Sequence, residues 1–262
     1  TTSSPPSRRD AWYTSNPSSG RTDSLKWYGL RQERHRRTHE NLPQASTGVE
    51  TKAYAPQSSD DFEATELGLQ WQFNHNPHDG YWSLTEKPGW LAIKSQKAEK
   101  LRTAFNQFTQ KTMGYKGVVT VKIDFAQLTP GGRTGIECIG NKFVGGGVIM
   151  EDKDGTATPR LYMEKDGTAQ TTSFNISSVM DKGIYIRLEI DAVNNKHKFY
   201  YSVDNETFIK FGDTFESGSG DWKGSRIGLY SYNTQETSGT AYFDEFTYLF
   251  DGPGGLASHT SK

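Results

Sequence analysis

Residues 184–191, IYIRLEID, alternate apolar and polar side chains without a break. A two-residue period is typical of a β-strand that buries one face and exposes the other. The segments VTVKIDF (119–125) and HKFYYSVD (197–204) show the same alternation. This pattern predicts antiparallel sheets in which one set of side chains forms a core and the other set faces outward.

Short polar segments separate the predicted strands. AVNNK (192–196) and VDNET (203–207) contain asparagines, which tolerate the positive φ of tight hairpins. EDKDGT (151–156) and EKDGT (164–168) flank a further strand around RLYME. The chain has 27 glycines and no segment with convincing helical periodicity. We therefore predict an all-β, mostly antiparallel sandwich of roughly a dozen strands.

Composition divides the chain into three parts. Residues 1–46 are rich in Ser, Pro, Thr and Arg without a sustained apolar period, which predicts a flexible or poorly packed leader. We expect the sandwich in residues 47–251 and a Gly-rich tail in residues 252–262. The first residues lack the apolar core of a signal peptide, so we expect any export signal to have been removed or to lie outside this sequence.

Charge and cysteine content exclude several classes of protein. The net charge of -1 gives no reason to expect nucleic acid or an anionic membrane as a partner. There is no run of about 18 apolar residues that would predict a membrane span. Cys138 is the only cysteine, which excludes an internal disulfide and multi-cysteine metal sites. It does not fix the compartment, although we favour a secreted or extracellular location.

Two motifs in the sandwich region carry a family resemblance. DDFEATELGLQWQFNHNPHDGYWSLTEKPGWLAIKS (60–95) resembles the opening of the concanavalin A-like domain that follows the five-bladed catalytic propeller in family 43 β-xylosidases. AFNQFTQK (104–111) resembles a second motif of that domain, with Phe105 and Lys111 in place of its two arginines. RIGLYSYNTQ and GTAYFDEFTY resemble its final strands, so the resemblance covers about residues 58–250.

The resemblance implies a concanavalin A-like, jelly-roll sandwich and an accessory role. Similar domains are classed as xylan-binding modules and also pack against the catalytic propeller. Residues 1–46 do not resemble the end of that propeller, and nothing in the chain could supply its three catalytic carboxylates. We therefore expect a non-catalytic domain that binds xylan or xylo-oligosaccharide, braces a family 43 propeller, or does both. A purely structural domain without glycan affinity is the alternative.

Outward aromatic side chains are the first candidates for binding a sugar. Recognition of a pyranose needs an aromatic face for the ring and planar polar groups for its hydroxyls. The strand alternation places such side chains on the outer faces at Tyr185, Arg187, Tyr200, Tyr230 and Tyr232, and Asn233 adjoins the last of them. Outward tyrosines also favour strands for structural reasons alone, so both interpretations stand.

The segment GLQWQFNHNP (68–77) mixes aromatic and amide side chains. The alternation favours Trp71 and Phe73 as core residues, whereas Asn74 and His75 are candidate contacts for a ligand or a partner domain. The alternative is that the polar residues of this corner bond their own backbone. In the second motif, Asn106 and Gln110 share one face of the predicted strand and are further candidates for sugar contact.

A glucanase-like enzyme is a rival interpretation. Family 16 glucanases share this type of sandwich and carry Glu-x-Asp-x-x-Glu on one strand. Here Glu189 and Asp191 share an outward face, but the third position is Asn194. An amide cannot donate a proton to a leaving group, so the acid/base half of the pair is missing. We expect no catalytic residues in this chain.

One structural calcium ion is the only cofactor we expect. Sandwiches of this type often hold calcium through carboxylates and backbone oxygens near the chain ends. Asp61 and Asp244 lie in the first and last predicted strands, which usually pair, and are therefore the candidate metal ligands. The alternative is that both are ordinary surface carboxylates.

Overall fold

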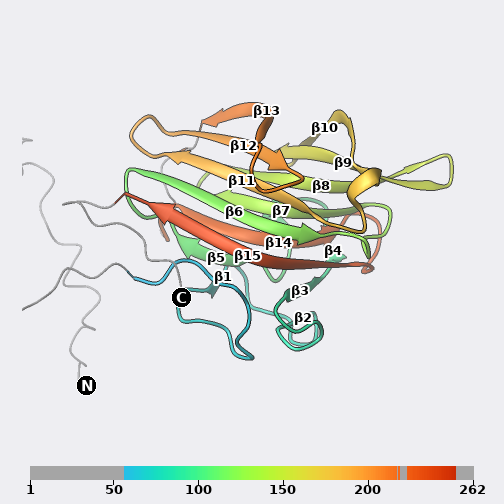
Figure 1. The fold of residues 1–262 in the computed structure, drawn as a ribbon, viewed down its shortest axis with the longest axis horizontal. Coiled ribbons are helices and arrows are strands. Elements are labelled where there is room, and N and C mark those ends of the chain that lie inside the picture. Colours follow the sequence, from blue (N-terminus) through green and yellow to red (C-terminus); the bar gives the residue numbers. More distant parts are fainter. Residues whose placement is uncertain (1–55, 217, 219–222, 252–262) are drawn as a thin grey trace, which may run out of the picture. The chain divides into compact units, whose positions relative to one another are not determined.

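A computed structural model describes residues 56–251 apart from residues 217 and 219–222. The predicted leader (1–46) and Gly-rich tail (252–262) lie outside the described residues. The described part is an all-β sandwich of two sheets (Figure 1), as predicted. Its only helices are the short 3-10 turns η2 (Leu101–Thr103) and η3 (Ser177–Val179). No helix among the described residues has the length and apolar character needed to cross a membrane.

The eight-stranded sheet carries β14 near its centre. In spatial order it contains β1 (Gln72–Phe73), β5 (Phe108–Lys111), β14 (Arg226–Asn233), β7 (Gly132–Ile139), β8 (Phe143–Lys153), β9 (Thr156–Lys165) and β10 (Thr168–Asn175). Strand β4 (Gln96–Lys97) pairs with β14 in parallel, and every other described pair in this sheet is antiparallel.

The seven-stranded sheet is antiparallel throughout the described pairs. In spatial order it contains β13 (Ile209–Glu216), β12 (Lys196–Ser202), β11 (Ile184–Asp191), β6 (Lys116–Asp124), β15 (Thr240–Phe250), β3 (Leu91–Lys94) and β2 (Trp82–Ser83). Strand β11 has the predicted bounds, and its burial alternates residue by residue. The first and last described segments meet where Asp60 bridges Phe246.

The main core lies between the two sheets and is built from the apolar members of the alternating strands. Ile186 and Leu188 from one sheet and Ile227 and Leu229 from the other are completely buried in it. Cys138 also packs there as a small apolar residue, and burial raises the pKa of its thiol to about 12. The predicted hairpins are confirmed as well: Asn195 and Asn205 take positive φ values of 53° and 62°.

A second, smaller core lies on the outer face of the eight-stranded sheet. It joins side chains of this sheet to the segment 98–107, which contains η2, and its members are Ala98, Leu101, Ala104, Ile139, Phe143, Ile149, Tyr162, Tyr230 and Tyr232. Gly145 allows Leu101 to approach closely, because a Cβ at this position would lie 2.7 Å from Leu101 Cδ2. The chain itself therefore covers part of this outer face.

A titratable side chain in the main core makes stability depend on pH. His197 is only 3% exposed, and burial lowers its pKa to about 4. The unfolded chain therefore binds a proton that the folded chain rejects, so stability is lost as pH falls from about 6.5 toward 4, by up to about 1.4 kcal/mol per pH unit.

We expect His197→Gln to remove this part of the acid sensitivity. Urea unfolding of both proteins between pH 7 and pH 4 should show a smaller loss of stability in the variant. His75→Gln, a change at an exposed histidine, serves as the control and should follow the parent protein. Parallel pH profiles of His197→Gln and the parent would contradict the assignment.

Candidate functional site

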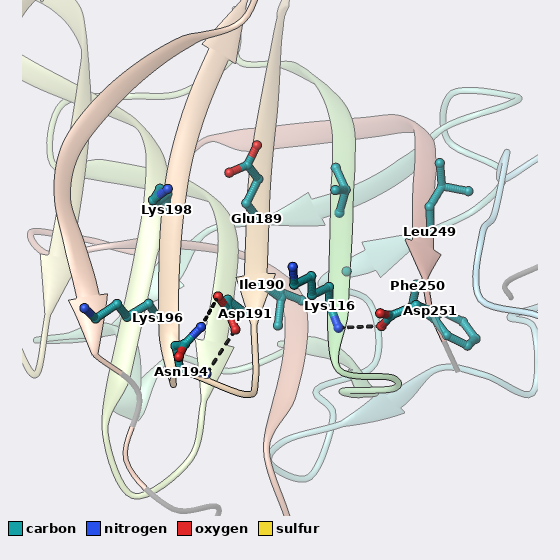
Figure 2. Close-up of a pocket in the computed structure, with 12 residues that line it drawn as sticks. Lys116, Glu189, Ile190, Asp191, Asn194, Lys196, Lys198, Leu249, Phe250 and Asp251 are labelled. Atoms are coloured by element: carbon teal, nitrogen blue, oxygen red, sulfur yellow. Dashed lines mark hydrogen bonds between the residues drawn. The ribbon is translucent and has the colours of Figure 1, made fainter. Parts of the chain in front are cut away.

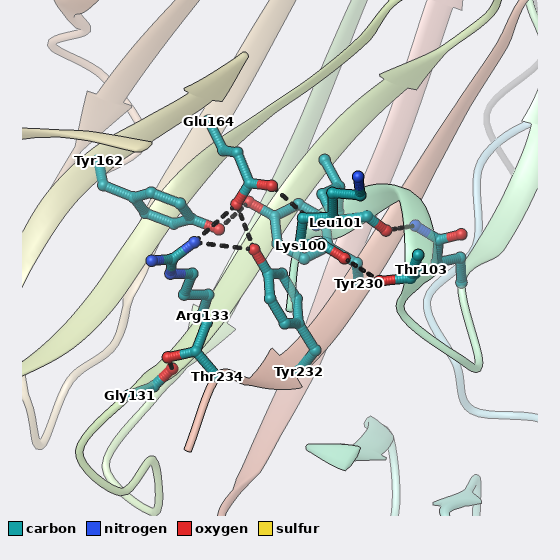
Figure 3. Close-up of polar contacts among 11 residues, drawn as sticks. Lys100, Leu101, Thr103, Gly131, Arg133, Tyr162, Glu164, Tyr230, Tyr232 and Thr234 are labelled. Carbon is teal, nitrogen blue, oxygen red and sulfur yellow. Dashed lines mark hydrogen bonds and ion pairs between the residues drawn. The ribbon is translucent and has the colours of Figure 1, made fainter. Parts of the chain in front are cut away.

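The outer face of the eight-stranded sheet is organised around the buried carboxylate of Glu164 on β9. One carboxylate oxygen accepts the backbone N–H of Leu101 at 2.7 Å. The other accepts Arg133 Nη1 at 2.9 Å and the hydroxyl of Tyr232. Figure 3 shows these side chains converging from three strands beneath the η2 segment. A buried carboxylate with several donors is stabilised in its charged form, so this cluster fastens the covering segment to the sheet.

A second buried carboxylate extends this polar layer. Glu137 on β7 is completely buried and accepts a hydrogen bond from Gln107 Nε2 at 2.8 Å. The same Nε2 donates to the backbone oxygen of Leu101. Burial raises the pKa of Glu137 well above its usual value. No cation is paired with Glu137 in the described contacts, so its burial favours the neutral acid over the carboxylate.

The prediction that Tyr230, Tyr232 and Asn233 present an exposed sugar face is wrong. The tyrosines do lie on the outer face, but all three side chains are completely buried. Tyr230 shares a hydrogen bond of 2.7 Å with Tyr162, and Asn233 Nδ2 donates to Pro130 O at 3.0 Å. Their ring and amide groups are therefore occupied within the fold.

Asn106 and Gln110 also have structural contacts instead of exposed ones. Asn106 is completely buried at a positive φ of 53°, and it accepts the backbone N–H of His78 and donates to the backbone oxygen of His78. Gln110 is 2% exposed and donates to Ser58 O at 2.8 Å. The expectation that these amides face a ligand is wrong, because each holds a neighbouring segment of backbone.

Asn74 and His75 belong to an exposed loop whose position is fixed from below. Asn74 Nδ2 donates to Gln107 Oε1 at 2.6 Å, and the His75 ring contacts Arg102 O at 3.0 Å. The loop continues to His78, whose ring stacks on Phe105 with centroids 4.1 Å apart. We call residues 74–81 together with Phe105 the rim. Its polar groups are partly used by the fold, while its residues 75–81 are exposed.

The aromatic residues that precede the rim are part of the core, as predicted. Trp71 is 6% exposed, its ring lies 4.9 Å from that of Phe246, and its Nε1 donates to Asp60 Oδ2 at 2.7 Å. Phe73 packs against the main core with its ring 4.8 Å from that of Phe108. The aromatic residues hold the sheet, and the polar residues after them shape the rim.

The predicted outward residues Tyr185, Arg187 and Tyr200 lie on the outer face of the seven-stranded sheet and are half-buried. Tyr185 donates to the carboxylate of Glu245 at 3.1 Å. Arg187 Nε donates to Thr120 Oγ1 at 3.0 Å, and Tyr200 donates to Glu189 at 2.9 Å. Part of this face is covered, because the Phe208 ring centroid lies 3.3 Å from Arg187 Cζ and Lys87 pairs with Asp124. The part lined by Glu189, Lys198 and Leu249 is open.

Of the glucanase-like interpretation, only one part is confirmed: Glu189 and Asp191 lie on the same face of β11. Glu189 accepts the Tyr200 hydroxyl, and Asp191 accepts both the backbone N–H and the Nδ2 of Asn194, at 3.0 and 2.8 Å. The contacts with Asn194 lower the pKa of Asp191. Asp191 and Asn194 therefore close the β11–β12 hairpin, and the missing proton donor is not replaced by another described contact.

The calcium expectation gains no support from the described geometry. Asp61 and Asp244 each accept a nearby backbone N–H, from Glu63 and Glu245 respectively. Among the described residues, no three His, Cys, Asp or Glu side chains gather closely enough to hold a metal ion. The pairing of the chain ends uses Asp60 instead. The calcium site stays a prediction.

Comparison with known proteins identifies the family. The family described as the β-xylosidase C-terminal concanavalin A-like domain matches residues 59–249. The chain belongs to this family. A β-xylosidase of Formosa agariphila is 35% identical over 221 residues, which cover 76% of this chain and 36% of the relative. A relative in Xylanibacter ruminicola is 36% identical over 166 residues, covering 62% of this chain and 28% of that protein.

A solved structure supports the same assignment. The bifunctional GH43-CE protein of Bacteroides eggerthii matches with a TM-score of 0.65 at 27% identity, covering 72% of this chain and 25% of that one. This β-xylosidase C-terminal domain thus spans about a third of the curated relatives. In such proteins the domain accompanies a catalytic domain.

The sequence interpretation missed the polar residues that organise the domain: Arg133, Glu137, Glu164 and Gln107. A sequence signal was present for Glu164, which shares the outer side of its strand with Tyr162, opposite the apolar Leu161 and Met163. The alternation of side chains along a strand shows on which face of the sheet a residue lies. It does not show whether another segment of the chain covers that face.

The contacts of Tyr232 predict a structural effect of its hydroxyl. Tyr232→Phe should cost about 1–3 kcal/mol of unfolding free energy, because Glu164 and Arg133 lose a buried partner. Tyr200→Phe removes the hydroxyl of a half-buried tyrosine and should change stability by less than about 0.5 kcal/mol. Chemical denaturation measures both, and equal effects of the two variants would contradict the buried network.

The raised pKa of Glu137 predicts a loss of stability toward alkaline pH. The folded chain holds a proton that the unfolded chain releases above about pH 4.5, so stability falls as pH rises toward the folded pKa, by up to about 1.4 kcal/mol per unit. Glu137→Gln keeps the shape of the neutral acid but cannot ionise. The variant should therefore gain stability over the parent between pH 5 and pH 8 in thermal unfolding. A constant difference across this range would show that Glu137 is ionised in the fold.

Proposed function

We propose that this chain is the accessory domain of a family 43 β-xylosidase-type hydrolase and that it docks against the catalytic propeller through the rim. Family membership and the partial coverage of the relatives support this role. Because the relatives are named as β-xylosidases, xylan-derived glycans are the proposed substrate class of the complete enzyme. Such polymers lie outside cells, which supports a secreted location.

The observation that carries the docking proposal is the construction of the rim. Asn106 fixes His78 through two backbone hydrogen bonds, at 2.8 and 3.1 Å, and Phe105 stacks beneath its ring. Tyr81 at the end of the rim is 37% exposed. Exposed aromatic and imidazole side chains on a preorganised loop are typical of recognition surfaces, because little conformational entropy is lost on binding.

The proposal assigns hydrolysis to the partner domain. Asp191 is engaged in the hairpin and Asn194 cannot supply a proton, which argues against the glucanase-like alternative. Release of reducing ends from laminarin by this chain, abolished in Glu189→Gln, would revive that alternative. A purely structural domain without glycan affinity is compatible with docking and is separated from glycan binding below.

The docking proposal is tested with the catalytic part of the Formosa agariphila relative, expressed without its matched C-terminal segment. Isothermal titration with the 262-residue chain should show saturable binding. The double variant His75→Ala, Tyr81→Ser should weaken binding by about tenfold or more, as expected when contact side chains are truncated. Val193→Ala, at a residue 64% exposed on the β11–β12 hairpin, is the control. Absence of binding, or equal binding by all three proteins, would refute docking through the rim.

A further inference from the structure

An open groove lies on the outer face of the seven-stranded sheet, apart from the rim. Its volume is about 720 Å³, which is within the range of sites for small ligands. Strands β12, β11, β6 and β15 contribute its floor and walls. Figure 2 shows Lys196 and Lys198 on one side of the groove and Leu249 on the other. Neither the family nor the rim assigns a role to this groove.

The strand register builds the groove from rows of side chains. Lys198 pairs with Glu189, Glu189 with Val118, and Val118 with Leu249, so one row runs from charged to apolar across four strands. In the neighbouring row, Asp191 lies between Lys196 and Lys116. With strands spaced by about 4.8 Å, the row from Lys198 to Leu249 is some 14 Å long, enough for an extended ligand of a few rings.

The charges of the groove balance. Its lining contains three lysines and three carboxylates, namely Lys116, Lys196, Lys198, Glu189, Asp191 and Asp251. Within the described residues, none of these lysines forms an ion pair. The carboxylates would repel an anionic ligand, and the lysine ammonium groups would repel a cationic ligand. The lining instead suits an uncharged ligand that needs both donors and acceptors.

The apolar end of the groove suits the face of a sugar ring. Leu249 is 47% exposed, and its neighbour Val118 is half-buried. Glu189 is oriented by the Tyr200 hydroxyl at 2.9 Å, which leaves its second carboxylate oxygen as an acceptor. Lys198 lies opposite Glu189 on the next strand as a donor. Leu249 and Val118 supply an aliphatic surface in place of the usual aromatic platform, and the polar groups beside them can bind the hydroxyls of a sugar.

We propose that this groove binds a neutral oligosaccharide, with the xylo-oligosaccharides as the class. The choice of xylose units rests on the proposed function, whereas the neutrality of the ligand rests on the lining alone. The ligand lies along the Lys198–Leu249 row, with its ring faces over Leu249 and Val118 and its hydroxyls toward Glu189 and Lys198. No bond is cleaved, so the groove holds substrate near a catalytic domain instead of converting it.

The proposal is tested by titrating the 262-residue chain with xylohexaose in isothermal calorimetry. Binding should be saturable, and Leu249→Ala should weaken it by about fivefold because exposed apolar area is lost. Lys198→Ala should weaken it by about threefold through loss of a donor. Val193→Ala should bind as the parent does. No saturable binding of xylohexaose, or equal affinity of Leu249→Ala and Val193→Ala, would overturn the proposal.

Two further measurements decide the nature of the ligand. Affinity for xylohexaose should stay constant between about 0.05 and 0.5 M NaCl, because screening does not affect an uncharged ligand. A uronate-bearing xylo-oligosaccharide should bind no more tightly than xylohexaose, and tighter, salt-sensitive binding would refute a neutral ligand. Leu249→Ala should leave docking to the catalytic part unchanged, and the rim variant should leave xylohexaose binding unchanged, so failure of one proposal does not imply failure of the other.

Discussion

The carboxylate of Glu164 joins two parts of the domain that are distant in sequence. It is buried, and a buried charge is tolerated only when donors surround it. Arg133 and Tyr232 supply donors from the sheet, and the Leu101 N–H supplies one from the covering segment. Removing the segment would expose apolar side chains and leave the carboxylate without one of its partners. The hydrogen bonds that the Glu164 carboxylate requires therefore help to hold the covering segment against this outer face.

That constraint also decides which outer face remains open to a ligand. On the eight-stranded sheet, the aromatic and polar groups that suit a sugar are present, but Tyr162 and Tyr230 bond each other beneath Leu101. On the seven-stranded sheet the segment before β3 covers only part of the outer face, where Lys87 pairs with Asp124 and Glu86 accepts the Tyr242 hydroxyl, and Leu249 stays exposed. The two faces differ in accessibility around these residues, because the Glu164 cluster binds a backbone donor from outside its sheet and the groove residues do not.

Much of the fold could be predicted from the sequence, because the two-residue alternation of apolar and polar side chains can be read within each strand by itself. It gave β11 its bounds, placed Trp71 in the core and assigned Tyr230 and Tyr232 to an outer face. The burial of these tyrosines depends on residues about 130 positions earlier in the chain and has no local signal. The same limit applies to Asn106, whose positive φ and bonds to His78 make it a backbone clamp, although its residue type also suits a sugar contact.

The rim and the groove share no described residue, and this separation has a functional consequence. The rim is held from the edge of the eight-stranded sheet, where β1 is the last strand and Gln107 bonds Asn74. The groove lies across β12, β11, β6 and β15 of the other sheet. Contact of a partner with the rim therefore leaves the groove lining in place, since no described residue belongs to both. A domain with this arrangement can be anchored by one surface and hold a glycan with the other.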